Sequence, residues 1–445
     1  MKKLSRSEFS QVSVMLFAMF FGAGNLIFPP LLGNQAGTFL WPALLSFSIT
    51  AVLFPVLGSI AVGKTRGLTN LANRVGPKFS IVFTLITFFS IGPGLGIPRA
   101  GSVPFELAIA PYIPANINLN AARFIYTLIF FAFALLVSLK PNELVDKMGK
   151  YLSPLLLILI AFMFFRLLFL PASVADPVGA YKTSPIAQGF LKGYETLDAI
   201  AALNFGLVIA MSISQLGIED QNEVTKYTAK AGIGAGALLF IVYAMLSFLG
   251  QRSSATLVGV ENGAIILSEA VSLALGNFGI VLLAVIFTLA CLTTCIGLIT
   301  SGGDYFYRLF KEKISYKSWV IIWTLFSFVF ANFGLNNLLA YSVPLLTLIY
   351  PVSLLLIVLG ISQDYIKYPR LSYQVGAFLA VILPFINLAN SYNIKLPFLT
   401  AFEQGLKFSD VGLSWILPTT FAVILVTLIY KVFSRQGSKV KSDLI

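Results

Sequence analysis

The chain contains no histidine, only two cysteines and few charged residues. Without histidine it lacks the commonest metal ligand and the side chain that most often acts as a general base near neutral pH. Cys291 and Cys295 lie four residues apart in one apolar run, so they cannot hold a metal ion alone and are poorly placed for a disulfide. Because no catalytic constellation is visible, we predict that the protein is not an enzyme and carries no covalent cofactor.

Apolar residues dominate what is present. Of the 445 residues, 58% are hydrophobic and 11% are charged, and the mean hydropathy is +0.89. This composition is typical of an all-α polytopic membrane protein. About twelve apolar runs are long enough to cross the ~30 Å hydrocarbon layer of a bilayer. These runs cover residues 10–32, 40–63, 79–98, 121–140, 151–171, 192–216, 230–250, 278–302, 318–333, 338–360, 371–390 and 412–433.

Two stretches between these runs are too polar or too broken to be predicted as spans. Residues 99–120 contain Arg99, Glu106, Pro111 and Pro114, so we expect an external loop or a short surface helix. Residues 253–277 are only partly apolar and carry two glutamates, and we expect an external lid segment there.

The formal net charge of +12 does not indicate a nucleic-acid partner, because the basic residues are scattered through short loops. Lys and Arg concentrate at the N-terminus, in alternate loops such as 64–78, 140–150 and 308–317, and in the C-terminal tail. Loops rich in Lys and Arg face the cytoplasm in multi-pass proteins. We therefore predict a chain embedded in a lipid bilayer with both termini cytoplasmic.

The first apolar run is interrupted in its middle. Residues 17–30 read FAMFFGAGNLIFPP, with Gly22, Ala23, Gly24 and Asn25 at the centre. Backbone that opens at membrane depth is tolerated only where it is buried in protein or lines a cavity. In transporters such breaks commonly hold the substrate. The alternative is a glycine-rich face that lets neighbouring helices approach closely.

A second interruption is predicted in the sixth run, at residues 201–206, where Asn204, Phe205 and Gly206 follow one another. Corresponding breaks in two halves of a chain indicate an inverted-repeat transporter with its site at the midplane. The spans then divide into five, five and two. We predict a first repeat over residues 1–175, an inverted second repeat over 176–370, and two additional helices with the tail over 371–445.

The helix dipoles at these breaks suggest the ligand. The second half of the first span begins near Gly24 and Asn25, and its free N–H groups suit a carboxylate. The first half ends with free carbonyls near residues 18–21, which suit a cation. The carbonyls of residues 199–202 in the sixth span suit an ammonium group. A zwitterion is the natural ligand for this arrangement.

The eighth run places Ala290, Thr293 and Thr294 at positions i, i+3 and i+4, on one helical face. Two hydroxyls and a carbonyl beside the carbonyls of the first span would form a neutral oxygen cage for a small cation. The alternative is that both threonines bond to carbonyls of their own or a neighbouring helix.

Two acidic residues near the start of the sixth span, Glu195 and Asp198, are candidates for proton coupling, because intramembrane acids are commonly functional. Their place within a turn of the membrane surface favours a different interpretation, namely solvated carboxylates at the mouth of a site.

Three motifs resemble the bacterial branched-chain amino acid:cation symporters of the amino acid–polyamine–organocation superfamily. They are FFGAGNLIFPPLLGNQAG at 20–37, IGPGLGIPRAGSVPFE at 91–106 and GYETLDAIAALNFG at 193–206. The resemblance implies uptake of leucine, isoleucine and valine across the bacterial inner membrane, driven by Na⁺ or, in some members, by protons. It also implies a LeuT-type fold with a five-plus-five inverted repeat and broken first and sixth helices.

The resemblance extends to individual positions. The segment of the first helix that would contact the substrate corresponds to residues 22–25. In the sixth helix the similar segment is unwound, and Phe205 would flank the aliphatic side chain of the substrate. The substrate contacts implied there are Ala199, Ala202, Leu203, Asn204 and Phe205. The Na⁺ ligands implied are Ala18, Phe21, Ala290, Thr293 and Thr294. The alternatives are a symporter of another amino acid or a nucleobase, or a proton-coupled version of the same transporter.

Overall fold

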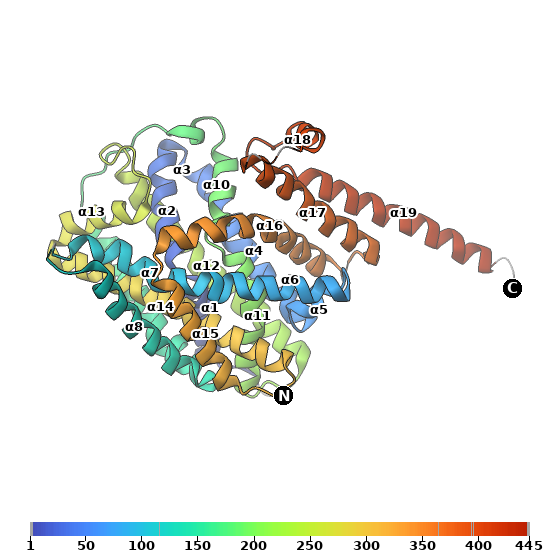
Figure 1. The fold of residues 1–445 in the computed structure, drawn as a ribbon, viewed down its shortest axis with the longest axis horizontal. Coiled ribbons are helices and arrows are strands. Elements are labelled where there is room, and N and C mark those ends of the chain that lie inside the picture. Colours follow the sequence, from blue (N-terminus) through green and yellow to red (C-terminus); the bar gives the residue numbers. More distant parts are fainter. Residues whose placement is uncertain (1–2, 115, 364, 393, 395, 443–445) are drawn as a thin grey trace. The chain divides into compact units, whose positions relative to one another are not determined.

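The computed structural model describes residues 3–114, 116–363, 365–392, 394 and 396–442, and no strand occurs among them (Figure 1). Ten helical stretches in this part of the chain are long and apolar enough to cross a membrane. Two shorter apolar helices, Gly263–Leu275 and Tyr316–Ala331, accompany them. The all-helical membrane fold predicted from composition is therefore confirmed.

Two features reconcile these stretches with the twelve predicted spans. The stretch Ala23–Thr65 is 43 residues long and contains both the second half of the first predicted span and the whole second span. Gly37 separates them with a φ of +49°, and a Cβ atom there would overlap the carbonyl of Ala175. Tyr316–Ala331 corresponds to the ninth predicted span.

The described chain forms two compact units, one from residues 1–64 and 88–342 and the other from 65–87 and 343–445. Two helices, α6 (Pro77–Phe89) and α16 (Leu335–Ser362), run from one unit into the other. The helices of the first unit are α1 (Arg6–Phe20), α2 (Ala23–Ala36), α3 (Leu40–Ser48), α4 (Phe54–Thr65), α7 (Gly96–Ala108), α8 (Leu119–Ser138), α9 (Ser153–Leu167), α10 (Pro185–Tyr194), α11 (Asp198–Gln215), α12 (Gln221–Arg252), α13 (Gly263–Leu275), α14 (Asn277–Leu309) and α15 (Tyr316–Ala331). The helices of the second unit are α5 (Leu68–Ala72), α17 (Arg370–Ser391), α18 (Pro397–Gln404) and α19 (Ile416–Ser442). Short 3-10 or π turns occupy 37–39, 49–53, 90–94, 110–112, 141–143, 145–152 and 179–182.

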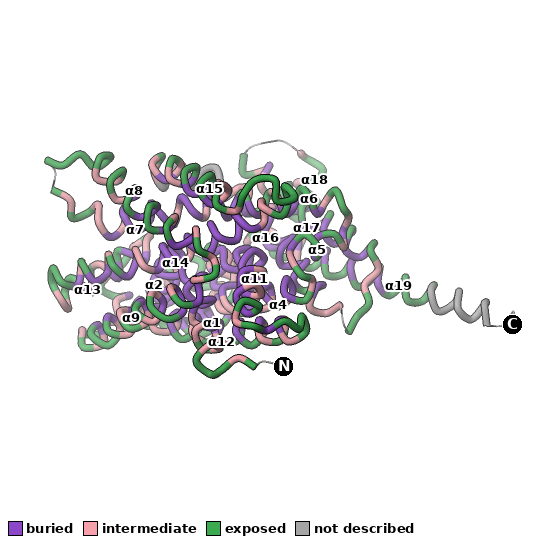
Figure 2. Tube along the Cα trace, turned by 90° about the horizontal axis from the view of Figure 1, so that it is seen from below, coloured by how far each residue is buried: buried purple, intermediate pink, exposed green. Residues whose placement is uncertain are grey.

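The core of the first unit lies along α1, α2, α11 and α14, where the buried segments gather (Figure 2). Phe17, Phe20, Phe205, Phe287 and Tyr243 are among its largest fully buried side chains. Lipid is as apolar as these side chains, so van der Waals packing between helices drives their burial. Three of these helices end or begin at a break: α1 and α2 flank the first, and α11 follows the second.

Helix α8 shows how the outer helices meet the membrane. Ile125, Leu128 and Ile129 are exposed on one face, while Thr127 and Phe131 are buried on the other. In a soluble protein such a contiguous apolar face would be an aggregation hazard. On a spanning helix it is the surface expected to contact lipid.

Glycines bring α2 and α12 into backbone contact. A Cβ atom at Gly33 would overlap the backbone of Ser247, and one at Gly250 would overlap the carbonyl of Pro30. Small residues allow this approach in membrane helices. The packing face that the sequence analysis raised as an alternative therefore exists on α2, about two to three turns beyond the break.

The third predicted span differs from expectation. It runs through α6, a π turn at residues 90–94 and α7, and forms one apolar stretch, Pro77–Tyr112. Gly92 leaves helical geometry inside the turn, with φ −84° and ψ −124°. The prediction that residues 99–120 form an external loop or a short surface helix is therefore wrong for residues 99–108, which belong to the largely buried helix α7. The glycines and prolines that suggested a loop instead break the helix and let it continue.

Candidate functional site

The first break lies where sequence reasoning predicted it. Helix α1 ends at Phe20 and α2 begins at Ala23, with Gly22 extended between them at φ −110° and ψ −158°. The side-chain oxygen of Asn25 accepts a hydrogen bond of 3.0 Å from the N–H of Gly22. This buried cap satisfies a donor that helix termini otherwise leave without a partner. Asn25 therefore stabilises the open backbone from inside the protein.

The second break lies earlier than predicted, between α10 and α11 at residues 195–197. Leu197 takes the left-handed conformation with φ +71°, which costs about 1–2 kcal/mol for a residue with a Cβ atom. The hydroxyl of Thr196 donates to the carbonyl of Gly193 at 2.9 Å and accepts from the N–H of Asp198 at 3.4 Å. Strained backbone of this kind clusters at functional sites.

The predicted break at residues 201–206 is wrong, because this segment is continuous helix within α11. A Cβ atom at Gly206 would come within 3.0 Å of Val62 and 3.1 Å of the carbonyl of Ser59. Gly206 is thus a packing glycine against α4. The glycine of the motif serves helix contact, and the opening at 195–197 lies about two to three turns before Gly206.

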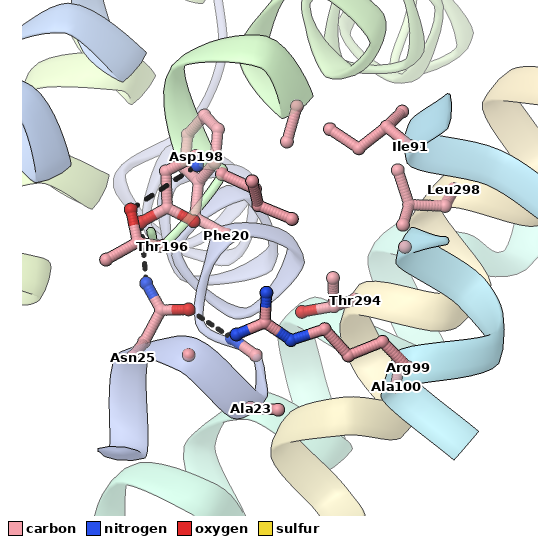
Figure 3. A pocket seen from close by; sticks show the side chains of 15 residues that line it. Phe20, Ala23, Asn25, Ile91, Arg99, Ala100, Thr196, Asp198, Thr294 and Leu298 are labelled. Carbon is pink, nitrogen blue, oxygen red and sulfur yellow. Dashed lines mark hydrogen bonds between the residues drawn. The ribbon is translucent and has the colours of Figure 1, made fainter. Parts of the chain in front are cut away.

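A cavity with a volume of about 50 Å³ lies where the two breaks meet the broken third helix (Figure 3). Four of its lining residues are the predicted Gly22, Ala23, Gly24 and Asn25. Its other walls come from α1, α7, α11 and α14. The complete lining is Phe20, Gly22, Ala23, Gly24, Asn25, Ile91, Gly96, Arg99, Ala100, Thr196, Leu197, Asp198, Ala201, Thr294 and Leu298.

The remaining substrate contacts predicted in the sixth helix do not reach this wall. Ala199, Ala202, Leu203, Asn204 and Phe205 are buried in α11 and do not line the cavity. Phe205 packs edge-on against Phe20, with ring centroids 5.6 Å apart. Because Phe20 itself lines the cavity, Phe205 stands one layer behind it. The shift follows from the displaced break, which brings Leu197, Asp198 and Ala201 to the wall instead.

Asp198 is a buried carboxylate at the start of α11, with only 2% of its surface exposed. It accepts hydrogen bonds from the amide of Asn25 at 2.6 Å and from the hydroxyl of Tyr243 at 2.9 Å. The Asn25 amide also contacts that hydroxyl. These donors compensate the burial of the carboxylate. The cluster links α2, α11 and α12 at the cavity.

The two predicted acidic residues therefore have different environments. The side chain of Glu195 is 47% exposed and pairs with Lys192 at 2.8 Å, which fits the solvated mouth position favoured from the sequence. That interpretation is wrong for Asp198, because the break at 195–197 folds the chain so that Asp198 points inward. The position of the break, at 195–197, accounts for the different environments of the two residues.

The oxygen atoms predicted to form a cation cage are brought together. The hydroxyl of Thr293 lies 2.9 Å from the carbonyl oxygen of Ala18, 3.0 Å from that of Ala290 and 3.1 Å from that of Leu289. The hydroxyl of Thr294 lies 3.4 Å from the Ala18 oxygen. The alternative prediction, that threonines bond carbonyls of their own and a neighbouring helix, describes the same geometry.

The remaining predicted Na⁺ ligand, Phe21, is the residue at which the first break opens. Phe21 N–H still donates to the carbonyl of Phe17 at 2.8 Å. No group of three acidic, cysteine or histidine side chains in the described chain is placed to hold a metal ion. The oxygens gathered around Thr293 are all neutral hydroxyl and carbonyl oxygens.

Arg99 is the charged lining residue that the sequence analysis did not name as a site residue. It projects from α7 toward the first turn of α2 (Figure 3). Its signal was present: Gly92, Pro93, Gly94 and Gly96 form an interruption of the same kind as that of the first helix. Treating residues from 99 onward as a loop hid the charge inside a span.

Comparison with known proteins gives a consistent result. A sequence model of the family described as "Branched-chain amino acid transport protein" matches residues 5–433. The branched-chain amino acid permease BrnQ of Lactobacillus delbrueckii subsp. lactis is 36% identical over 436 residues, which is 96% of this chain and 98% of the relative. BrnQ of Bacillus subtilis strain 168 is 38% identical over 422 residues, which is 94% of this chain and 95% of the relative.

The fold is similar to those of solved transporters. A nucleobase-cation-symport-1 family transporter, closed with bromovinylhydantoin bound, has a TM-score of 0.61 at 14% identity and covers 96% of this chain and 93% of that one. A Na⁺-coupled sialic acid symporter in a substrate-bound outward-open state also has a TM-score of 0.61, at 15% identity. The match covers 94% of this chain and 89% of the symporter. At these identities the likeness concerns the fold alone.

Proposed function

Because the chain belongs to the family of branched-chain amino acid transport proteins, which are multi-pass membrane transporters and not enzymes, we propose that it imports leucine, isoleucine and valine together with Na⁺. The membrane would be the bacterial inner membrane, with both termini in the cytoplasm. The observation that carries the proposal is the cavity where two helix breaks meet, beside the oxygen cluster around Thr293.

The cavity suits an aliphatic amino acid. Ile91, Leu298, Phe20 and Ala201 supply apolar wall, against which a branched side chain gains about 0.8 kcal/mol for each buried CH₂ group. The helix ends and the polar groups of Asn25 and Asp198 are available to the charged end of the ligand. A wall of this kind ranks leucine, isoleucine and valine weakly, since one methylene is worth only about 1–3 kcal/mol.

Sodium coupling is supported by the donor set. The carbonyl of Ala18 ends α1 at the first break, and the hydroxyls of Thr293 and Thr294 approach it from α14. Thr294 also lines the substrate cavity, and a Cβ atom at Gly22 would lie 3.0 Å from its hydroxyl. An ion on one side of Gly22 and an amino acid on the other would stabilise the same conformation of the break. Each would then raise the affinity for the other.

Proton coupling is the second candidate, and Asp198 is the observation that favours it. An acidic residue buried at a substrate cavity inside a span is the kind of group that relays protons in transporters. In that case the ion gradient would act at Asp198, and the oxygen cluster around Thr293 would serve only to hold α1 against α14.

The deciding experiment is uptake of labelled leucine into proteoliposomes with sodium and pH gradients imposed separately. We expect saturable uptake driven by an inward sodium gradient at equal pH on both sides. Uptake driven only by an inward proton gradient would show that the coupling ion is H⁺ and not Na⁺. Leucine flux that neither gradient can drive uphill would reject symport, and ion current without saturable leucine uptake would indicate a channel.

A further inference from the structure

Arg99 is a cation within a candidate membrane span, and no acidic side chain among the described residues lies within ion-pair distance of it. It lies in the apolar stretch Pro77–Tyr112, is half-buried, and lines the cavity. Among the described residues it forms neither an ion pair nor a hydrogen bond. A charged side chain at membrane depth is costly and usually marks a functional site. The expected partner of an unpaired guanidinium is an anion that is not part of the protein.

The guanidinium is held at the cavity and away from lipid. It lies over the ring of Phe28, 5.7 Å from the centroid. One of its terminal nitrogens would be 3.3 Å from a Cβ atom at Gly24, so the group sits above the first turn of α2. The absence of a side chain at Gly24 leaves room for it there. Arg99 therefore faces the same helix end that was predicted to receive a carboxylate.

The opposite charge in the cavity belongs to Asp198, and the hydrogen bonds from Asn25 and Tyr243 both reach the same carboxylate oxygen, Oδ2. Arg99 and Asp198 do not pair with each other, and they approach the cavity from different helices (Figure 3). The cavity thus presents one positive and one negative group. An α-amino acid carries the complement of both within a single molecule.

We propose that Arg99 binds the carboxylate of the substrate and that Asp198 receives its ammonium group. The assignment rests on the proposed function and specifies how the charged end of the amino acid is recognised. A guanidinium can bind a carboxylate through two parallel hydrogen bonds, and its planar fork distinguishes it from a lysine. Charged side chains at the ends of the cavity act alongside the backbone groups of the two breaks.

The test compares leucine with leucinamide, which keeps the ammonium group and the side chain but lacks the carboxylate. The dissociation constants of both are measured by calorimetry on purified protein at pH 6.5 with saturating sodium. We expect the parent to prefer leucine by about tenfold or more, as for a hydrogen-bonded charge pair. In Arg99→Gln leucine should weaken until the two constants are nearly equal, while leucinamide keeps its affinity.

Lys192→Gln is the matched control. Lys192 lies over the same ring of Phe28, also at 5.7 Å, but pairs with Glu195 and does not line the cavity. Its removal should leave the preference for leucine unchanged. If Arg99→Gln does not fold, Arg99→Lys takes its place, and its preference should fall below that of the parent because the planar fork is lost.

Three outcomes would overturn the assignment. The first is an unchanged preference in the Arg99 variant, and the second is equal weakening of leucine and leucinamide, which would indicate a structural role. The third is the same loss of preference for leucine in Lys192→Gln, which would show that any nearby positive charge produces the preference. A parent protein that bound no branched-chain amino acid would instead overturn the proposed function itself, and the assignment with it.

Discussion

The amide of Asn25 donates a 2.6 Å hydrogen bond to the carboxylate of Asp198, joining residues 173 positions apart. Each residue lies in the first turn of the half-helix that follows a break. The other end of the same amide caps the N–H of Gly22. One side chain therefore ties the two breaks together, so a change at Asn25 should affect both at once.

Replacing Asn25 by Ala should weaken leucine binding by tenfold or more. The change removes one donor from a buried carboxylate and one acceptor from a buried N–H, and each loss costs about 1–3 kcal/mol. Asn34→Ala is the control, since Asn34 lies on the same helix and donates to the carbonyl of Leu257 at 3.1 Å, outside the cavity. Calorimetry measures the leucine affinity of both variants. Equal affinities for Asn25→Ala and Asn34→Ala would contradict the prediction.

Replacing Thr293 by Ala should make leucine binding require more sodium, since the hydroxyl central to the oxygen cluster is lost. Losing one buried polar ligand costs about 1–3 kcal/mol, so half-maximal leucine binding should need about 5 to 150 times more sodium. Thr293→Ser keeps the oxygen and should behave like the parent. Leucine affinity is measured against sodium concentration at fixed pH.

The control for this series is Thr288→Ala on the same helix, where the hydroxyl bonds Tyr126 at 2.9 Å away from the cluster. Parallel sodium curves for the parent and Thr293→Ala would leave the threonine with a purely structural role. The same measurement on Thr294→Ala shows whether the hydroxyl facing Gly22 contributes.

Replacing Gly24 by Leu should abolish leucine uptake while the protein still inserts. A Cβ atom at Gly24 would lie 3.0 Å from the ring of Phe28 and 3.3 Å from both Arg99 and Thr196, so a larger side chain would fill the cavity. Gly232→Ala is the control, because its Cβ atom would meet Val56 only at 3.6 Å, an ordinary contact. A well-expressed Gly24→Leu protein with normal binding would remove the first break from the site.

The predicted topology is tested by cysteines introduced singly at Asn70 and Ala180, which are both exposed. An impermeant maleimide added to intact cells should label the cysteine at 180 and not the one at 70, because the loop at 64–78 is basic and expected inside. The native Cys291 and Cys295 are buried and give little background. Labelling at 70 from outside would invert the orientation.

The first break and the oxygen cluster could both be predicted from local sequence. Gly22 and Gly24 interrupt an otherwise apolar span, and helical periodicity alone places Ala290, Thr293 and Thr294 on one face. In each case the deciding signal lies within two turns of one helix. The prediction of the cluster also assumed that the first and eighth spans are neighbours, which the contacts of Thr293 and Thr294 with the carbonyl of Ala18 bear out.

The second break and Arg99 required tertiary information. Gly206 looks like a break in sequence, but it packs against Val62 and Ser59, and this contact depends on where α4 lies. The real opening at 195–197 contains no glycine. Leu197 takes the left-handed conformation there, which a sequence pattern does not predict for a leucine. Arg99 was assigned to a loop because a charge after several glycines and prolines normally ends a span.

The cavity has three unlike walls, a guanidinium from Arg99, a carboxylate from Asp198 and an apolar side that includes Ile91 and Leu298. If each wall takes one substituent of an amino acid, the α-carbon is fixed at three of its four positions. Exchanging two substituents would then direct either the side chain or a charged group toward the wrong wall. A site built in this way distinguishes its ligand from the mirror image, so D-leucine should be a poor competitor for L-leucine.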